Sequence, residues 1–127
     1  MNRHEEALKI LKKGTVIPAI PLVLDENRNF DKDGQRLLIN YYADCGVGGI
    51  AAAVHTTQFE IREPKYNLLE PVLKTVSEEI DRYVMKSGKV IIKVAGVCGE
   101  TEQAAREAEI ARKYGFDAVL LSPGGLN

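Results

Sequence analysis

The residues best suited to chemistry in this sequence form one short polar run, His55, Thr56, Thr57 and Gln58. The run directly follows a stretch of small apolar residues, 49–54, which is typical of a buried strand in a parallel sheet. In α/β folds, the chemistry lies just past the C-terminal ends of such strands. Two hydroxyls, their backbone N–H groups and an imidazole at this place can hold a small carboxylate, because paired donors suit an oxyanion.

Each of these residues also has a simpler interpretation. Thr56 and Thr57 could cap the turn after the strand, as Ser and Thr often do. His55 could be a general acid or a partner of the carboxylate, or it could be a hydrogen-bonded histidine at the rim, and its ordinary pKa fits both. We take His55, Thr56 and Thr57 as candidate substrate-binding residues, with His55 also a candidate catalytic residue.

Lys93 is the second candidate catalytic residue, because it interrupts the β-branched run of 90–94 in a strand expected over 89–95. Ile92 and Val94 are expected to face the helices, so the alternation of a strand sends Lys93 toward the axis of a barrel. There it could bind an anion or, if desolvated, act as a nucleophilic amine. The alternative is an inward ion pair, because buried lysines are usually paired.

Further along the chain, the segment Gly96-Val97-Cys98-Gly99 reads as a tight strand-to-helix turn. Its backbone N–H groups could hold an anion, or it could be a plain turn. Cys45 and Cys98 have neither metal-ligand nor disulfide-framework spacing, so we expect small buried thiols and no metal.

The elements that must position these residues follow from hydrophobic periodicity. We expect helices over 3–13, 30–45, 71–87 and 101–114, and strands over 15–24, 49–54, 89–95 and 116–122. The strands start far enough apart for right-handed crossovers that each carry a helix, which indicates a parallel sheet. Pro18 and Pro21 make the first strand edge-like or bulged.

Local signals refine three of the helices. Asp31 is expected to cap the second helix, Gly46 to end it, and its buried face to consist of Leu37, Leu38, Tyr41, Tyr42 and Cys45. Pro71 is expected to divide a short lead-in turn from the third helix, whose apolar stripe is Val72, Leu73, Val76, Ile80, Tyr83 and Val84. Thr101 is expected to cap the fourth helix.

Four βα steps are half of a (β/α)8 barrel, which needs about 250 residues. The predicted fold class is therefore α/β, of the parallel TIM-barrel type, with a short N-terminal helix before the first four steps. We expect residues 1–127 to form one N-terminal half barrel with no second domain. A four-stranded sheet alone would leave two unpaired edges, so we favour a fragment over a dimerising half barrel or a small doubly wound domain.

The composition excludes several classes of partner. The formal charge is −1, with 17 basic and 18 acidic residues, and no Lys/Arg run suggests nucleic acid or anionic membrane as a partner. No segment is long and apolar enough to span a bilayer, and the start lacks the layout of a signal peptide. The two cysteines, which lack framework spacing, suggest reduced thiols, and we therefore expect a cytoplasmic protein.

Several short motifs, in this order and spacing, resemble the N-terminal half of the dihydrodipicolinate synthase/N-acetylneuraminate lyase family of class I aldolases. They are Ala19-Ile20-Pro21, the run Asp44 to Ile50, Thr56-Thr57, Ala95-Gly96-Val97, Thr101-Glu102-Gln103-Ala104, and Gly115 to Val119 before Pro123.

The resemblance implies a TIM barrel in which a lysine forms a Schiff base with pyruvate or a similar 2-keto acid, without a further cofactor. It implies that Thr56 and Thr57 hold the keto acid's carboxylate, and that the full-length protein is a homo-oligomer. The Schiff-base lysine and the catalytic tyrosine belong to the second half of the barrel, beyond Asn127, so this chain alone is expected to be inactive.

The chain departs from the family pattern at two places. The family has Gly-Thr-Thr-Gly-Glu, whereas the positions around the threonines here are His55, Gln58 and Phe59. Gly124 and Gly125 stand where the family has an aromatic pair, which removes the tyrosine expected in its proton relay. The alternative is therefore a non-catalytic α/β binding or interaction domain that has lost the aldolase chemistry.

Overall fold

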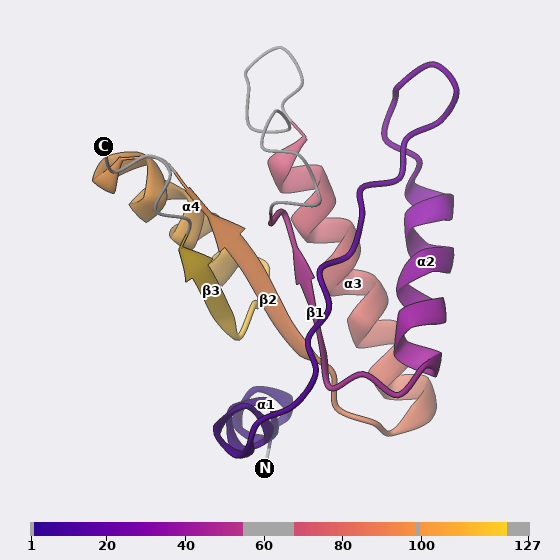
Figure 1. Cartoon of the computed structure of the whole chain (residues 1–127), viewed down its shortest axis with the longest axis vertical. Coiled ribbons are helices and arrows are strands. Elements are labelled where there is room, and N and C mark those ends of the chain that lie inside the picture. Colours follow the sequence, from indigo (N-terminus) through magenta and orange to yellow (C-terminus); the bar gives the residue numbers. More distant parts are fainter. Residues whose placement is uncertain (1, 55–67, 99, 122–127) are drawn as a thin grey trace.

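A computed structural model describes residues 2–54, 68–98 and 100–121. Within them lie the elements α1 (Arg3–Lys13), α2 (Lys32–Asp44), β1 (Gly49–Ala52), α3 (Leu69–Ser87), β2 (Ile92–Val97), α4 (Thr101–Lys113) and β3 (Ala118–Leu121). The three strands form a parallel sheet in the order β1-β2-β3 (Figure 1). The predicted α/β class with a parallel sheet is confirmed.

The predicted first strand, 15–24, is instead an extended segment that runs parallel to β1. The Gly48 N–H donates to the Val16 carbonyl at 3.0 Å. One bridge also joins it to β1, with Ala51 donating to the Pro18 carbonyl and Ile20 donating to the Ala51 carbonyl, both at 2.9 Å. Prolines have no N–H to give to a strand ladder, which explains why the pairing stays sporadic here. The described sheet therefore has three strands, and the four-step half barrel remains a proposal.

Two apolar clusters mark the two faces of the sheet. The first, the helix-layer cluster, joins α2, α3 and α4 to one face and includes Ile39, Ile50, Ala52, Ala53, Leu73, Val76, Ile80, Ala95 and Ala111. The second, the α1-side cluster, comprises Ala7, Ala51, Val54, Ile92 and Val94, with Ile10 and Leu11 packed against it. Figure 1 shows α1 lying by the N-terminal ends of the strands. Residues of β1 and β2 thus alternate between the two clusters, whereas Val119, Leu120 and Leu121 of β3 are exposed.

Helix α2 begins and ends as predicted, but of its predicted buried face only Leu38 and Tyr42 pack, partly buried, against the helix-layer cluster. The Asp31 side chain accepts a hydrogen bond from the Gly34 N–H, and Gly46 has a φ of 86° after the helix. The buried residues, however, are Gln35, Ile39 and Ala43, whereas Leu37 and Tyr41 are 74% and 65% exposed and Cys45 is also exposed. The predicted set is too wide for one helical stripe, and the i, i+4 row centred on Ile39 is the one that meets the sheet.

Gln35 is buried although it is polar, because its amide bonds the extended segment. Its Oε1 accepts from the Val23 N–H at 2.9 Å and its Nε2 donates to the Pro21 carbonyl at 3.1 Å. The segment's backbone thereby obtains partners that no neighbouring strand supplies.

Helix α3 differs from the prediction at its first residues, and α4 differs at its cap and ends one residue earlier, at Lys113. Pro71 lies inside the first turn of α3 and does not divide it, because the N–H groups of a first turn need no intrahelical acceptor. The predicted apolar stripe of α3 is confirmed, and Gly88, at a φ of 74°, follows its end. Thr101 is the first residue of α4 and not its cap, since Glu100 occupies the cap position without a side-chain hydrogen bond. No helix in the described ranges is long and apolar enough to cross a membrane.

Candidate functional site at the C-terminal ends of the strands

The three residues predicted to bind substrate, His55, Thr56 and Thr57, lie outside the described residues, as do Gly124 and Gly125. The structure describes the strand ends that lead to them. The parallel pairing brings the C-terminal ends of β1 and β2 to the same edge, with Ala52 opposite Ala95. The predicted site therefore begins immediately after Val54, at the edge where α/β folds carry their chemistry.

Ala53 ends β1 by adopting a left-handed backbone conformation. Its φ is 60°, which is unusual for a residue with a Cβ, and it is fully buried. For an L-residue this conformation costs about 1–2 kcal/mol. Such strain persists only where the surroundings enforce it, and it occurs preferentially at functional sites.

Gly96 on β2 lies directly against this turn. A Cβ on Gly96 would come within 2.5 Å of the Ala53 carbonyl oxygen and 2.9 Å of the Val54 Cγ1. The missing side chain of Gly96 is therefore what lets the backbone of Ala53 approach β2 so closely.

The turn after β2 binds a carboxylate that belongs to the protein itself. The Cys98 N–H donates to Glu107 Oε1 at 2.9 Å, and Gln103 Nε2 donates to Glu107 Oε2, also at 2.9 Å. Glu107 is 5% exposed. Of the two interpretations of this segment, the geometry favours a turn closed by Glu107. A sequence signal did exist, because Glu107 shares a helical stripe with Ala104, Ala108 and Ala111.

Lys93 faces the helix layer and not the axis, so the predicted direction is wrong. Its Nζ lies 2.6 Å from Asp81 Oδ1 and donates to Ser77 Oγ at 2.9 Å, and both partners are on α3. Ile92 and Val94 were expected to face the helices, but they belong to the α1-side cluster, so alternation places Lys93 on the helix side. The structure shows the ion-pair alternative, but the pair with Asp81 lies on the helix side of the sheet and not on the inward side. The pKa of the Lys93 ammonium lies below its ordinary value. Burial lowers it, and the hydrogen bond to Asp81, which raises it, offsets only part of that effect.

Asp117 is a buried charged residue that the sequence patterns did not single out. Its side chain is fully buried and accepts from both terminal nitrogens of Arg3, each at 2.7 Å, and from the Lys93 N–H at 2.8 Å. His4 Nδ1 lies 2.6 Å from Asp117 Oδ1. Burial raises the pKa of the Asp117 carboxyl, but the hydrogen bonds from Arg3, Lys93 and His4 outweigh it, so the pKa lies below its ordinary value.

The network around Asp117 joins α1 to the N-terminal ends of the strands. In TIM barrels the opposite, C-terminal ends of the strands carry the chemistry, and the N-terminal ends serve stability. We therefore assign Asp117 and Lys93 to the support of the fold.

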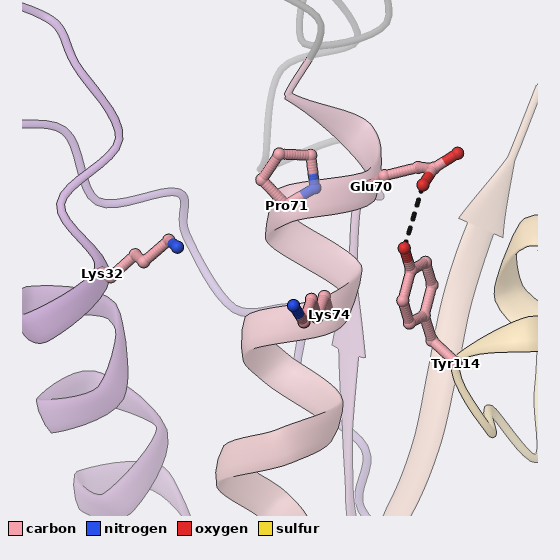
Figure 2. A pocket seen from close by; sticks show the side chains of 5 residues that line it. All are labelled: Lys32, Glu70, Pro71, Lys74 and Tyr114. Carbon is pink, nitrogen blue, oxygen red and sulfur yellow. Dashed lines mark hydrogen bonds between the residues drawn. The ribbon is translucent and has the colours of Figure 1, made fainter.

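A shallow pocket lies on the helix layer and is lined by Lys32, Glu70, Pro71, Lys74 and Tyr114 (Figure 2). The Tyr114 hydroxyl donates to Glu70 Oε2 at 2.9 Å, and this hydrogen bond raises the pKa of Tyr114. Its two lysines are solvent-exposed, so the pocket is a feature of the outer surface. Across the described part of the chain, no three His, Cys, Asp or Glu side chains group in a way that could hold a metal ion.

Comparison with solved structures identifies proteins of the same fold. The chain is similar to YagE of E. coli K12, a prophage protein of the dihydrodipicolinic acid synthase family solved in complex with pyruvate, at a TM-score of 0.69 and 17% identity over 83% of this chain and 33% of that one. Dihydrodipicolinate synthase from Oceanobacillus iheyensis matches at a TM-score of 0.69 and 17% identity, over 94% of this chain and 36% of that one. N-acetylneuraminate lyase from Fusobacterium nucleatum matches at a TM-score of 0.67 and 16% identity, over 84% of this chain and 34% of that one.

No protein-family model and no curated protein matches the chain. The chain spans about a third of the length of the solved structures it resembles. At these identities the likeness concerns the fold, and it agrees with the motifs found in the sequence. Over that third, the chain has the fold of the dihydrodipicolinate synthase/N-acetylneuraminate lyase family.

Proposed function

We propose that this chain is the N-terminal half of the barrel of a Schiff-base-forming lyase or aldolase that acts on pyruvate or a similar 2-keto acid. The chain supplies the side of the site that holds the substrate's carboxylate, and the Schiff-base lysine lies beyond residue 127. The observation that carries this proposal is the agreement between the fold and the family motifs along the same chain.

Within this proposal, Thr56 and Thr57 donate to the carboxylate. They come a few residues after β1, and a parallel sheet brings the residues beyond its strand ends together at one edge. Hydroxyl and backbone N–H donors at such an edge form charge-assisted hydrogen bonds with an oxyanion. His55 stands next to them as a partner of the carboxylate or as a general acid.

The binding half of the proposal can be tested by NMR on a polypeptide that includes the residues after Asn127, because the proposed site needs both halves of the barrel. Titration of the labelled chain with pyruvate is expected to give saturable shifts at the amides of Ala53, Val54 and Cys98, which flank the site. Methyl pyruvate, which lacks the carboxylate, is expected to give none. The double variant T56V/T57V keeps the side-chain shape without the hydroxyls and is expected to lose the response, whereas the control T101V keeps it.

The chemical half requires a polypeptide that includes the residues after Asn127. A lysine amine that condenses with the pyruvate ketone loses water to form an imine, which borohydride reduces to a stable amine. The expected result is a gain in mass at a single lysine after treatment with pyruvate and borohydride. Saturable pyruvate binding without that mass gain would instead support the non-catalytic binding domain. The same polypeptide is expected to be a homo-oligomer by sizing.

A further inference from the structure

The pocket on the helix layer brings together two lysines from neighbouring helices. Lys32 is the first residue of α2, Lys74 lies on α3, and both line the same hollow (Figure 2). The volume of this hollow is about 420 Å³, which is ample for a small polyatomic ion. Among the residues that the structure describes, no carboxylate forms an ion pair with either ammonium. Both charges therefore face the pocket without an acidic partner.

Lys74 would ordinarily find an acidic partner on its own helix. Glu70 precedes it by four residues, and a Glu followed by a Lys at this spacing usually forms a pair on a helix surface. Here Glu70 turns to other partners, since the Tyr114 hydroxyl donates to its Oε2 at 2.9 Å and Lys113 Nζ lies 3.9 Å from the same oxygen. Figure 2 shows Glu70 extending toward Tyr114, whereas the ammonium of Lys74 points toward the side of Lys32. The carboxylate that lines the pocket is thus engaged away from the two lysines.

The electrostatics of this arrangement favour an anion. Two ammonium groups that line one hollow repel each other, and an anion between them replaces that repulsion by attraction to both. The N-terminal end of α3 adds to the positive field, because its capping residue, Leu68, accepts no hydrogen bond with its side chain. Pro71 forms the wall between the lysines and the first turn of α3.

We propose that this pocket binds a small molecule that carries a phosphate group, held between Lys32 and Lys74. A phosphate monoester carries about 1.5–2 negative charges at pH 7 and has three acceptor oxygens, so one group can accept hydrogen bonds from both ammoniums. A carboxylate, with a single charge, balances only one of them. The pocket does not depend on the proposed function, because it lies on the outer surface of the helix layer and not at the strand ends where a keto acid would bind.

The test is an NMR titration of the polypeptide that includes the residues after Asn127. The probes are inorganic phosphate, phenyl phosphate as a monoester, and acetate as an ion with a single charge. Both phosphates are expected to give saturable shifts at the amides of Gly34, Val72 and Tyr114, which lie around the pocket, and acetate is expected to give none. Tighter binding of phenyl phosphate would identify an ester as the ligand, and equal affinities would identify the free ion.

Two double variants separate the pocket from the net charge of the protein. K32Q/K74Q removes both ammoniums and is expected to weaken phosphate binding by about tenfold or more, because each charge-assisted hydrogen bond is worth that much. K12Q/K86Q removes the same charge from two lysines that do not line the pocket, and it is expected to bind within about twofold of wild type. All four lysines are exposed, so neither variant should disturb folding.

A third variant is expected to act in the opposite direction. E70Q removes the negative charge from the lining of the pocket but keeps an oxygen that can accept from the Tyr114 hydroxyl. Phosphate should therefore bind to E70Q more tightly than to the wild-type protein, by about twofold or more.

The outcomes test the pocket and the proposed function separately. Phosphate shifts that do not saturate, equal weakening by K12Q/K86Q and K32Q/K74Q, or weaker binding by E70Q would each overturn the phosphate site. A protein that binds phosphate at the pocket but does not respond to pyruvate would overturn the proposed function alone. A protein that binds pyruvate but gives no phosphate shifts at Gly34, Val72 and Tyr114 would overturn the phosphate site alone.

Discussion

Asp117 and Arg3, 114 positions apart in the chain, meet in a two-pronged ion pair in which both nitrogen–oxygen distances are 2.7 Å. The carboxylate is fully buried and the guanidinium is 19% exposed. Because α1 carries Arg3 and Asp117 stands just before β3, this pair joins the first element of the chain to the last described strand. Paired donors and acceptors in this arrangement are among the strongest hydrogen bonds in proteins.

Replacing Asp117 by Asn should therefore destabilise the chain strongly. The amide keeps the shape but leaves the Arg3 guanidinium and the Lys93 N–H without a charged acceptor, which costs about 3 kcal/mol for a buried pair. Urea unfolding measures the loss. The matched control is D33N, since Asp33 is 93% exposed and pairs with Arg36 at 3.5 Å, and it should cost less than about 0.5 kcal/mol. Equal effects of the two substitutions would contradict the role of the buried pair.

The Asp117 carboxyl should also make the free energy of unfolding fall at acid pH. Because the pKa of Asp117 is lower in the folded chain than in the unfolded one, the unfolded chain takes up the proton first as the pH falls. The stabilisation is complete above the ordinary pKa of about 3.9 and is lost as the pH falls through the folded-state value. Urea unfolding at pH 6, 5, 4 and 3 should show a steeper loss for the wild-type chain than for D117N. If the unfolding free energies of the wild-type chain and D117N fell in parallel with pH, Asp117 would contribute nothing to the loss of stability in acid.

Much of the local structure could be predicted because it depends on neighbouring residues. Gly46 and Gly88 end helices because each adopts a positive φ, and Asp31 caps a helix through an N–H three residues on. The parallel sheet follows from the spacing of apolar segments. The stripe of α3 follows from helical periodicity alone.

The errors arose where a distant partner decides the outcome. Strand β2 is buried on both faces, so its pattern does not reveal which side Lys93 takes, and only Asp81 on α3 settles it. Asp117 lies near the start of the strand predicted over 116–122, and nothing local in the sequence shows that its partner is Arg3. The predicted carboxylate site at Thr56 and Thr57 stays a prediction, because the described residues reach only to its border.

The pair formed by Lys93 and Asp81 should respond differently to removal of each partner. Lys93 is buried, with 3% of its side chain exposed, whereas Asp81 is 55% exposed. K93M removes the buried charge and leaves Asp81 to water and to Arg3, whose Nε lies 3.9 Å from Asp81 Oδ1, so the unfolding free energy should stay within about 1 kcal/mol of wild type. D81A leaves an ammonium buried and poorly paired, which should cost about 3 kcal/mol.

This asymmetry also predicts a pH dependence for D81A. Burial already lowers the pKa of Lys93, and loss of the Asp81 partner lowers it further. A lysine whose folded-state pKa lies below its unfolded one binds fewer protons when folded, so stability rises with pH between the two values. The deficit of D81A should therefore shrink between pH 7 and about pH 9.5. A K93M variant less stable than D81A at pH 7 would contradict this account of the pair.

The carboxylate of Glu107 should decide whether the turn after β2 keeps its shape. E107A removes the acceptor of the Cys98 N–H and of the Gln103 amide, and an orphaned buried donor costs about 1–3 kcal/mol. Hydrogen exchange of the Cys98 amide should accelerate in E107A more than global destabilisation explains. E107Q keeps one acceptor oxygen and should lie between E107A and the wild-type chain.

The control for this turn lies on the same helix. Glu109 is 73% exposed and pairs with Arg112 at 3.6 Å, so E109A should leave the Cys98 amide unaffected and change stability by less than about 0.5 kcal/mol. Because the turn directly follows β2, at the edge where β1 leads into the proposed carboxylate site, a change there should also reach pyruvate binding. We expect E107A to weaken the pyruvate response in the NMR titration and E109A to leave it intact. Unchanged exchange at Cys98 in E107A would mean that other groups hold the turn.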